Sequence, residues 1–540
     1  MPRVIVVDVL AREHGRRVVT VDVIGVGPRA VAGLLERLGV RADVYPLEAV
    51  LRDPRILRGY DALFASAMSS DKPAAARLAE LWARRGGGGP AVIGGPVAAE
   101  PLEALRLGYD YVVYGEAEAV LPKAIDAILA DDREALLGVR GLAFRLGRRP
   151  VFTGRPGYAP REALAYPHSD MVEGYDAYWA ARVYVEVVRG CSNWRRPRGR
   201  LPDGRECINC DVCVRAPLRA RLSCPAWIPP GCGYCSVPAL YGPARSRPPD
   251  VIVEEVKRLV DKGVTRIVLS APDVLDYGRD LLVDPEPLTD PCNPPANLEA
   301  LRRLLEALFD KVPEFEAGEA YLLVENVKAC LVDESVARLL GEYLRGTPVH
   351  IGVETGSDRH MWLLGRPITR ADAERAVRLL ARHGLEPYVY FIYGLPWEDD
   401  ETRRETIELM ERLWRLGAVK VTAYRFRPLP GTAFQDFSPP PPGSPSYEIL
   451  EKAVELNRRE KLRWLGRRVR AVIAGWHPAK RMLVAYPLPH GPVVLVRGPR
   501  SLVGWLVRVE VTGVESDRML RGRVVARLRR LGRRAKRVPV

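Results

Sequence analysis

The sequence predicts an α/β protein in three parts: an N-terminal doubly wound parallel sheet, a central partial TIM-type α/β barrel and a small C-terminal OB-like β-barrel. Three observations carry this prediction. Apolar strands alternate with amphipathic helices over the first 130 residues, a second strand–helix series starts at residue 183, and only strands follow residue 466. Alternating strands and helices form parallel sheets, whereas successive short strands with glycine turns form sandwiches or barrels.

The N-terminal part, residues 1–135, is expected to begin with the strands RVIVVDVL and RVVTVDVIG and to continue in strand–helix pairs. Ligands of doubly wound sheets bind beyond the carboxyl ends of the strands. Those ends are expected at residues 25–27, 66–70, 94–96 and 115–116, and all but one contain glycine. Glycine lets a backbone approach a ligand closely, but it also makes tight turns, and the sequence leaves both interpretations open.

A connector with proline-rich and strand-like pieces is expected over residues 136–180, and the barrel over residues 181–437. Within about six strand–helix repeats, the expected strands include VYVEVV, TRIVLSAPD, VHIGVETGS, EPYVYFIYGLP and KVTAYRFRPLPGT. In such barrels the functional loops follow the strands. The proline-rich stretch SPPPPGSPS opens a linker, residues 438–465, that ends in a helix over residues 447–464.

The C-terminal part, residues 466–528, is expected to contain the strands RVRAVIAGW, KRMLVAYPL, GPVVLVRG, GWLVRVEVTGV and RGRVVARL. A basic tail, residues 529–540, is expected after it. Ten of the residues 518–537 are Arg or Lys and none is acidic. The net charge of +15 favours a polyanionic partner, although the Arg-rich, Gln-poor composition of a thermophile protein gives the same excess. Basic residues beside an OB-like barrel favour RNA.

The chain shows no sign of a membrane span or a leader. No apolar run approaches the ~20 residues that cross a bilayer, and the start, MPRVIVVDVLAREHG, lacks the pattern of a signal peptide. We therefore expect a cytoplasmic protein. In that reducing compartment, clustered cysteines indicate metal ligands or redox groups, not a disulfide framework.

Seven of the nine cysteines lie between residues 191 and 235. Cys191 directly follows the first expected barrel strand, and Cys232 and Cys235 lie in GCGYC, just before a helix. The three thiolates can converge above the carboxyl end of that strand, where barrel chemistry takes place. Three thiolates on a [4Fe–4S] cluster leave one iron open to bind and reduce a cofactor.

The other four cysteines lie in an insertion, residues 192–231, with the spacing C-x2-C-x2-C-x10-C-P: Cys207, Cys210, Cys213 and Cys224. Four thiolates make a closed site, which holds either a second [4Fe–4S] cluster or zinc. A rival partition groups Cys224 with Cys232 and Cys235 and leaves Cys191 with the other three. Cys292 and Cys330 are isolated and are expected to be packing thiols.

Together, five segments resemble the radical S-adenosylmethionine (radical SAM) superfamily, and the methylthiotransferases in particular. They are RGC…GCGYC, RIVLSAPDVLDYG, VHIGVETGSDRHMWLLGRPIT, YFIYGLPWEDDETRRETIELM and YRFRPLPGTAF. The resemblance covers roughly residues 180–460. The chain departs from the family pattern C-x3-C-x2-C, because 40 residues separate its first two cysteines.

The resemblance implies that S-adenosylmethionine (SAM) binds the open iron and is cleaved by one electron to methionine and a 5′-deoxyadenosyl radical. The electron would come from a donor such as ferredoxin or flavodoxin. It also implies roles in holding SAM for residues after the second, fourth and fifth strands: Asp273 for the amine, Glu354, Thr355 and Ser357 for the ribose or amine, Arg366 for the carboxylate, and Gly394 and Pro396 for the adenine.

The two flanking parts carry weaker resemblances. VIGGP and DYVVYGEAEAVLP are similar to the cobalamin-binding-type domain that precedes many radical SAM barrels, but no D-x-H-x-x-G supplies a histidine for cobalt. The absence of this histidine leaves open whether the domain binds cobalamin. GWLVRVEVTGVESDRMLRGRVV resembles a TRAM domain, an RNA-binding module of tRNA-modifying enzymes.

Three functions follow as hypotheses. The leading one is a radical SAM transferase that methylthiolates or methylates RNA, with tRNA as the expected partner. The second is a cobalamin-dependent radical SAM methylase that acts on a small molecule, a lipid or a protein. The third is a non-catalytic, zinc-containing nucleic-acid-binding protein, which leaves the barrel motifs without an explanation.

Overall fold

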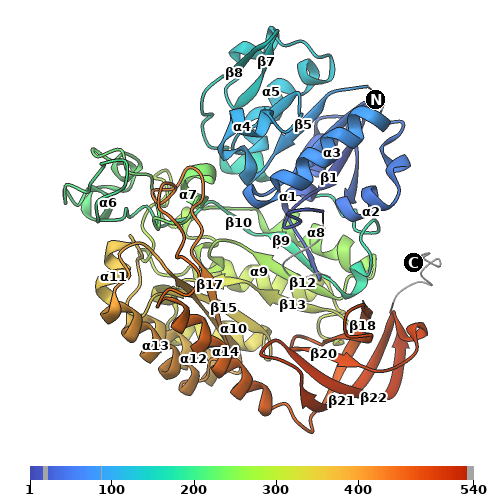
Figure 1. The fold of residues 1–540 in the computed structure, drawn as a ribbon, viewed down its shortest axis with the longest axis vertical. Helices are drawn as coiled ribbons and strands as arrows, with labels where there is room; N and C mark the ends of the chain where they lie inside the picture. The colour runs from blue at the N-terminus through green and yellow to red at the C-terminus, as the bar shows by residue number, and fades with distance from the viewer. Residues whose placement is uncertain (16–21, 87, 532–540) are drawn as a thin grey trace.

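The fold has three structured parts, which Figure 1 shows as a blue sheet domain, a green-to-orange barrel and a small red barrel. It is a computed structural model that describes residues 1–15, 22–86 and 88–531. The α/β class, the central barrel and the closed C-terminal barrel that the sequence predicts are all present.

The N-terminal sheet has seven strands in the order β3-β1-β4-β5-β6-β7-β8, and helices α1 to α5 pack on it. The strands are β1 (Arg3–Asp8), β3 (Arg41–Pro46), β4 (Ala62–Ser66), β5 (Ala91–Gly94), β6 (Tyr111–Val113), β7 (Leu142–Leu146) and β8 (Arg149–Phe152). The helices are α1 (Gly27–Arg37), α2 (Leu47–Arg52), α3 (Lys72–Arg85), α4 (Pro101–Leu105) and α5 (Ala117–Leu129). The first five strands are parallel, as the alternation predicts.

Two segments join a different sheet from the one that the sequence indicates. Strands β7 and β8 lie in the expected connector but extend the N-terminal sheet as an antiparallel pair, because Leu142, Ala143 and Phe144 are buried against it. Strand β2 (Val23–Ile24) pairs with the first barrel strand, not with the N-terminal sheet. The beginning of that expected strand, residues 17–21, lies outside the described residues.

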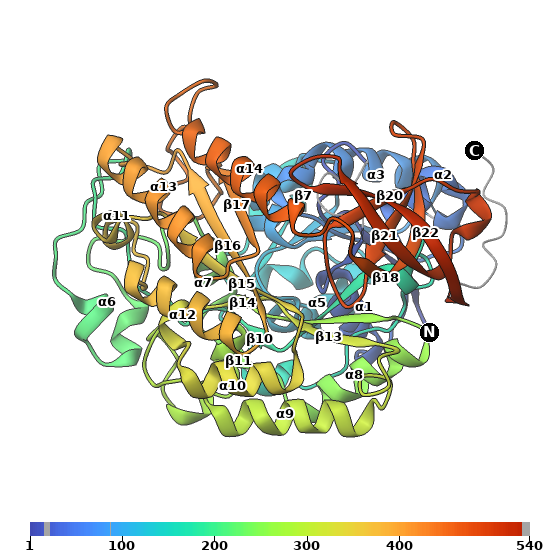
Figure 2. The same cartoon turned by 90° about the horizontal axis from the view of Figure 1, so that it is seen from below.

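The central barrel is open and consists of two four-stranded sheets, β13-β12-β9-β2 and β14-β15-β16-β17. Its strands are β9 (Arg182–Glu186), β12 (Arg266–Ser270), β13 (Tyr321–Val324), β14 (Asn326–Val327), β15 (Pro348–Glu354), β16 (Glu386–Tyr393) and β17 (Lys420–Arg425). Around them run α8 (Pro249–Asp261), α9 (Leu298–Lys311), α10 (Glu334–Tyr343), α11 (Asp358–Leu363), α12 (Arg370–Arg382), α13 (Asp400–Arg415) and α14 (Tyr447–Leu462), most of them in the outer layer of Figure 2.

The third barrel strand is absent from the strands expected from the sequence. It is made of β13 and β14, and Glu325 between them joins the two sheets. The Glu325 N–H donates to the Leu269 carbonyl (3.3 Å), and its carbonyl accepts from the His350 N–H (2.8 Å). The sheet is therefore continuous across the break.

The C-terminal barrel closes in the order β18-β19-β20-β22-β21. Its strands are β18 (Arg468–His477), β19 (Met482–Pro487), β20 (Val493–Val496), β21 (Trp505–Val514) and β22 (Met519–Arg530). All five were expected. However, β22 extends to residue 530, so the first residues of the expected basic tail belong to a strand, and residues 532–540 lie outside the described residues.

This small barrel packs against the amino-terminal ends of the central strands. Val472, Tyr486 and Leu506 cluster with Ala180, which lies just before β9. Arg470 donates a hydrogen bond to the hydroxyl of Tyr321, the first residue of β13. The opposite, carboxyl ends of the strands stay free for other contacts (Figure 1).

Buried ion pairs hold the N-terminal part against the central barrel. Arg29 of α1 pairs with Glu255 of α8, and both side chains are fully buried. Glu255 also lies 3.0 Å from the Arg247 guanidinium. Separating a buried pair would leave an uncompensated charge, and this energetic cost keeps α1 and α8 in one relative position. Among the described residues no helix has the length and apolar character needed to span a membrane.

We expect Glu386 to destabilise the barrel at neutral pH. Burial, together with Glu460 of α14, raises its pKa from 4.5 to about 7, although Arg467 lowers it. Between pH 4.5 and 7 the folded chain keeps the proton on Glu386, whereas the unfolded chain releases it. The free energy of unfolding therefore falls as the pH rises from 4.5 to 7, and the stabilisation present below pH 4.5 is lost by pH 7. E386Q should raise the free energy of unfolding above pH 7 by about 3 kcal/mol.

Chemical denaturation between pH 5 and 9 checks this expectation, with the exposed Glu451 of α14 as the matched control. E451Q should follow the wild-type profile. A constant difference between E386Q and wild type over the whole range would contradict the assignment.

Candidate site at the carboxyl ends of the barrel strands

Three thiols meet at the carboxyl end of the first barrel strand. Cys191 follows the short strand β10 (Val188–Arg189), and Cys232 and Cys235 precede α7 (Val237–Tyr241). Asn193 connects two of them, because its N–H lies 3.4 Å from Cys191 Sγ and its side-chain amide 3.2 Å from Cys232 Sγ. Burial, with the neighbouring thiols, raises the pKa of Cys235 to about 12.

The chemistry of this trio fits a cationic metal group. Burial likewise raises the pKa of Cys191 to about 12, so without a cation Cys191 and Cys235 stay protonated at neutral pH. Metal binding requires thiolates and releases their protons. In the described chain no three His, Cys, Asp or Glu side chains have the arrangement that a single ion needs. The fit therefore rests on the donor atoms and on their common location.

Arg366 and Glu354 lie beside Cys232, as expected for a site next to the cysteines. Arg366 Nη1 is 3.7 Å from Cys232 Sγ, and its Nη2 is 4.0 Å from Glu354 Oε1 and donates to the Gly352 carbonyl. The Arg366 Nε is buried and has no acceptor among the described residues. A Cβ on Gly352 would lie 2.5 Å from Glu354 Oε1, so glycine makes room for this pair.

Glu354 itself has a strained backbone. Its φ is +74°, a left-handed conformation that costs a non-glycine residue of the order of 1–3 kcal/mol. Burial raises the pKa of its carboxyl group, although Arg366 lowers it. The strain points the end of β15 toward the cysteines, where a carboxylate next to an arginine can bind a zwitterionic ligand.

Two other expected SAM-binding residues, Asp273 and Ser357, have protein partners. Asp273 is fully buried; its Oδ1 accepts from the N–H groups of Leu275 and Lys328, and its Oδ2 lies 2.9 Å from Lys328 Nζ. Its Oδ1 is thus filled by backbone donors, whereas Oδ2 forms an ion pair with Lys328 but no hydrogen bond among the described residues. Ser357 caps α11 by accepting from the His360 N–H (3.5 Å).

Gly394 and Thr355 also serve the local fold. Gly394 has a φ of +73°, and a Cβ there would lie 2.1 Å from Pro440. Its N–H donates to Glu398 (2.9 Å), so glycine is needed for this turn and its contact with the proline-rich linker. The Thr355 hydroxyl faces Thr406 of α13 (3.3 Å), away from the cysteines. These contacts explain the residues without a ligand.

A buried amine, Lys328, is the main site residue that the sequence analysis missed. Its Nζ lies 2.5 Å from Ser192 Oγ and 3.0 Å from Asp276 Oδ1, in addition to Asp273. Burial lowers the pKa of Lys328, but the charges of Asp273, Asp276 and Cys191 raise it by more. The net pKa lies above its usual value, so the amine is cationic beside Cys191. A lysine directly after a barrel strand is the signal that could have identified it.

The other four clustered cysteines lie together in the insertion, which projects near α6 (Val212–Arg215) at the left of Figure 1. Cys207, Cys210, Cys213 and Cys224 line one small cavity. The lining of this cavity includes Cys224 and none of Cys191, Cys232 and Cys235. Arg196 lines the same cavity and donates to the backbone carbonyls of two residues, Trp194 (2.6 Å) and Arg221 (2.7 Å).

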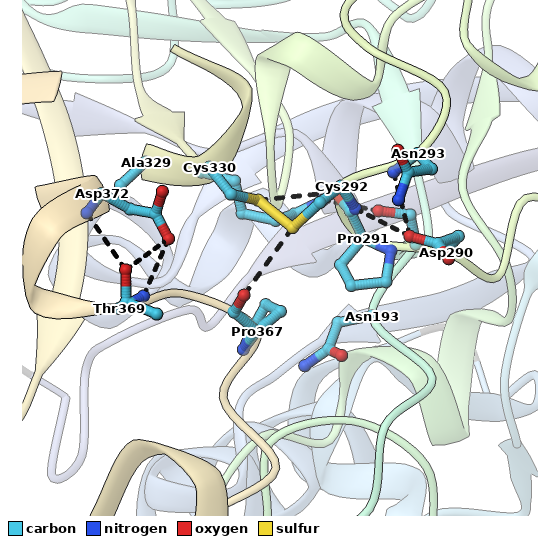
Figure 3. Close-up of a disulfide and its surroundings, with 12 residues drawn as sticks. Asn193, Asp290, Pro291, Cys292, Asn293, Ala329, Cys330, Pro367, Thr369 and Asp372 are labelled. Carbon is cyan, nitrogen blue, oxygen red and sulfur yellow. Dashed lines mark hydrogen bonds between the residues drawn. A yellow bond between two sulfur atoms is a disulfide. The ribbon is translucent and has the colours of Figure 1, made fainter. Parts of the chain in front are cut away.

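Cys292 and Cys330 form a disulfide, so the expectation of two isolated packing thiols was wrong (Figure 3). Their Cα atoms are 5.9 Å apart although 38 residues separate them in sequence. The tertiary fold brings the loop after Asp290 against the turn that follows Lys328. The Pro291 carbonyl between them accepts from Lys328 Nζ (3.3 Å).

The glycines at the carboxyl edge of the N-terminal sheet are explained by contacts between loops. A Cβ on Gly95 would lie 2.8 Å from the Ala67 carbonyl, and one on Gly27 would lie 3.0 Å from Ser66 Oγ. Asp71 accepts from the backbone N–H groups of three residues after β1: Ala11, Arg12 and Glu13. Tight loop packing accounts for this edge, whether or not it also meets a ligand.

Comparison with known proteins identifies the barrel. Residues 229–410 match the pattern of the Radical SAM superfamily. A protein of Methanopyrus kandleri is 44% identical over 97% of this chain and 96% of its own length, and one of Methanocaldococcus jannaschii is 35% identical over 97% and 98%. Neither has an assigned activity.

Relatives with named activities match only part of the chain. The tRNA-2-methylthio-N(6)-dimethylallyladenosine synthase of Moorella thermoacetica is 28% identical over 54% of this chain, which spans 63% of that enzyme. Among solved structures, the cobalamin-bound radical SAM methyltransferase TsrM of Kitasatospora setae has a TM-score of 0.56, with 16% identity, 81% of this chain and 74% of that chain covered. At this identity the likeness concerns the fold alone.

Removal of the Lys328 charge should destabilise the barrel strongly. K328M leaves two fully buried carboxylates, Asp273 and Asp276, without their shared cation. The loss of one partner of a buried ion pair should lower the free energy of unfolding by about 3–5 kcal/mol. K257M is the matched control, because Lys257 pairs with Asp261 on an exposed helix face. It should cost less than about 0.5 kcal/mol. Chemical denaturation measures both, and equal effects would refute the role assigned to Lys328.

Proposed function

The chain belongs to the radical SAM superfamily, and from this premise we propose that it is a transferase that modifies RNA, with tRNA as the substrate and methylthiolation or methylation as the reaction. One observation supports this most. A single chain combines three thiols at the carboxyl ends of its barrel strands with a closed C-terminal barrel whose outer face is basic.

The residues for the first cofactor are Cys191, Cys232 and Cys235, which would hold a [4Fe–4S] cluster. Such a cluster would supply the electron for the cleavage of SAM to methionine and a 5′-deoxyadenosyl radical. Arg366 and Glu354 would bind the carboxylate and amine of SAM, since a guanidinium fork matches a carboxylate. Ferredoxin or flavodoxin is the proposed class of electron donor.

Hydrogen-bond donors and cations surround two of the thiols. The Asn193 N–H groups point at Cys191 Sγ and Cys232 Sγ, and Arg366 contributes a cationic donor to Cys232. Lys328 lowers the pKa of Cys191 electrostatically, against the larger effect of burial. Such hydrogen bonds and charges tune the reduction potential of iron–sulfur groups.

The second cysteine set, Cys207, Cys210, Cys213 and Cys224, would hold either a second [4Fe–4S] cluster or zinc. Arg196 favours a group with net negative charge, because this buried cation is ringed by carbonyls and has no carboxylate partner in the described part of the chain. A metal held by four thiolates would supply that charge.

The RNA-binding surface that we propose is the outer face of the C-terminal barrel. Arginines on three neighbouring strands are exposed there: Arg468, Arg470, Arg508, Arg521, Arg523, Arg527 and Arg529. Arg470 and Arg508 are directly opposed across β18 and β21. Like charges in that position repel each other, and a phosphate backbone would relieve the repulsion.

A second candidate is a cobalamin-dependent methylase that acts on a small molecule, a lipid or a protein. The fold likeness to two cobalamin-binding radical SAM enzymes favours it; OxsB, the second, has a TM-score of 0.54 over 86% of this chain. Cobalamin absorbance in the purified protein would support this candidate. The non-catalytic zinc protein has lost support, since the superfamily pattern falls on the barrel.

The two cysteine sets should separate in a cleavage assay. C232A/C235A should abolish reductive cleavage of SAM, because two of the three ligands for the first site are gone. C210A/C213A should retain cleavage and lose either about four irons or about one zinc per chain, as measured by metal analysis. Residual cleavage by C232A/C235A at the wild-type rate would contradict the proposed cluster site.

RNA binding should depend on the basic face of the C-terminal barrel. R508Q/R523Q/R527Q removes three exposed charges and should lower the slope of log affinity against log salt by about 2, from roughly 0.7 per phosphate contact. SAM cleavage without RNA should stay unchanged. R302Q/R303Q/R338Q, on the outer helices α9 and α10, is the matched control. If both triple variants bind tRNA equally, the proposed surface is wrong.

A further inference from the structure

A cavity of about 440 Å³ is lined by residues of the cysteine-rich insertion and of α11. The ribbons of α6 and α11 lie next to each other at the edge of the molecule in both Figure 1 and Figure 2. Five arginines and one acid line it: Arg195, Arg196, Arg198, Arg215, Arg366 and Asp211. The volume falls within the usual range of small-molecule sites. Its lining is far more basic than that of a typical apolar pocket.

The positive charge of this pocket is largely uncompensated. Asp211 lies 2.8 Å from Arg198 Nη2 and 3.6 Å from Arg215 Nε, so one carboxylate serves two arginines. Arg196 donates to carbonyl groups alone, and the Arg195 guanidinium has no carboxylate within bonding distance among the described residues. Burial lowers the pKa of Arg195, although the charge of Asp290 raises it.

The pocket also offers an aromatic face. Trp362 of α11 is 52% exposed, and the Arg198 guanidinium carbon lies 4.8 Å from its ring centroid. An exposed indole beside arginines matches the two parts of a nucleotide, because a base stacks on an aromatic ring and guanidinium groups bind phosphate in forked pairs.

The position of the pocket connects the two cysteine sites. Arg366 lines it and also contacts Cys232, while Arg196 and Arg198 also line the cavity of the other four cysteines. The basic face of the C-terminal barrel lies at the opposite, amino-terminal end of the strands. An RNA held there needs a second set of phosphate contacts to keep one nucleotide near the cysteines.

We propose that this pocket binds one nucleotide of the RNA substrate, with its phosphate on Arg195 and Arg215 and its base on Trp362. The inference rests on the proposed function for the identity of the RNA, but not for the chemistry of the pocket. It assigns to the insertion a role in substrate binding besides that of holding a metal group.

Equilibrium dialysis of the full-length protein tests the pocket, with AMP and adenosine as probes and excess SAM to fill its own site. Wild type should bind AMP at least tenfold more tightly than adenosine. R195Q/R215Q should lose that preference, and W362L should weaken the binding of AMP about tenfold. R219Q is the matched control, because Arg219 lies in the same insertion but pairs with Glu286.

A single-stranded RNA oligonucleotide forms the second arm. R195Q/R215Q should lower the salt slope of its binding by about 1.4, at roughly 0.7 per arginine. Equal binding of AMP and adenosine by wild type, or an unchanged AMP preference in R195Q/R215Q, would overturn the inference. W362L/R215Q, with both side chains exposed, repeats the test if the first variant does not fold. A protein that binds AMP here but neither binds nor modifies RNA would refute the proposed function and leave the pocket standing.

Discussion

Arg189 couples the N-terminal sheet to the first cysteine. Its guanidinium lies 2.6 Å from Glu186 of β9 and 3.1 Å and 3.3 Å from Glu118 and Glu116 beyond β6. Glu116 also binds Arg245 of the short strand β11 (Arg245–Ser246). Because these carboxylates are almost fully buried, loss of the partner of any one of them would strongly destabilise the fold. Cys191 follows two residues later, so the place of the first thiol depends on the docking of a domain that contributes no thiol itself.

The sequence allowed the regular elements to be predicted wherever a pattern is local. Strand alternation identified the five strands of the C-terminal barrel and five of those in the central barrel. The third barrel strand was missed because Glu325 breaks it into two short pieces, of which neither has a clear period. Strand β2 was assigned to the wrong sheet because its partner is chosen by the ion pairs of Asp22 with Arg182 and Arg266.

In the candidate site too, local patterns could be predicted from the sequence and tertiary contacts could not. Cysteine spacing separates a group of three from a group of four, and in the structure the group of four lines one cavity. Lys328 and Asn193 could not be assigned roles, because their partners lie on segments that only the tertiary fold brings together. Asp273 was expected to bind SAM because it follows a strand, but in the structure its Oδ2 forms an ion pair with Lys328, a buried lysine after the next strand. The disulfide escaped prediction for the same reason.

The Cys292–Cys330 bond lies within one residue of Pro291, whose carbonyl meets Lys328 (Figure 3). Thiol–disulfide exchange opens such bonds when a reducing agent reaches them. A thiol reductant used to prepare the protein can therefore open a covalent link next to the Lys328 contact. Samples prepared under different reductants can then differ in the mobility of this loop, and the oxidation state of the pair has to be defined alongside the metal content.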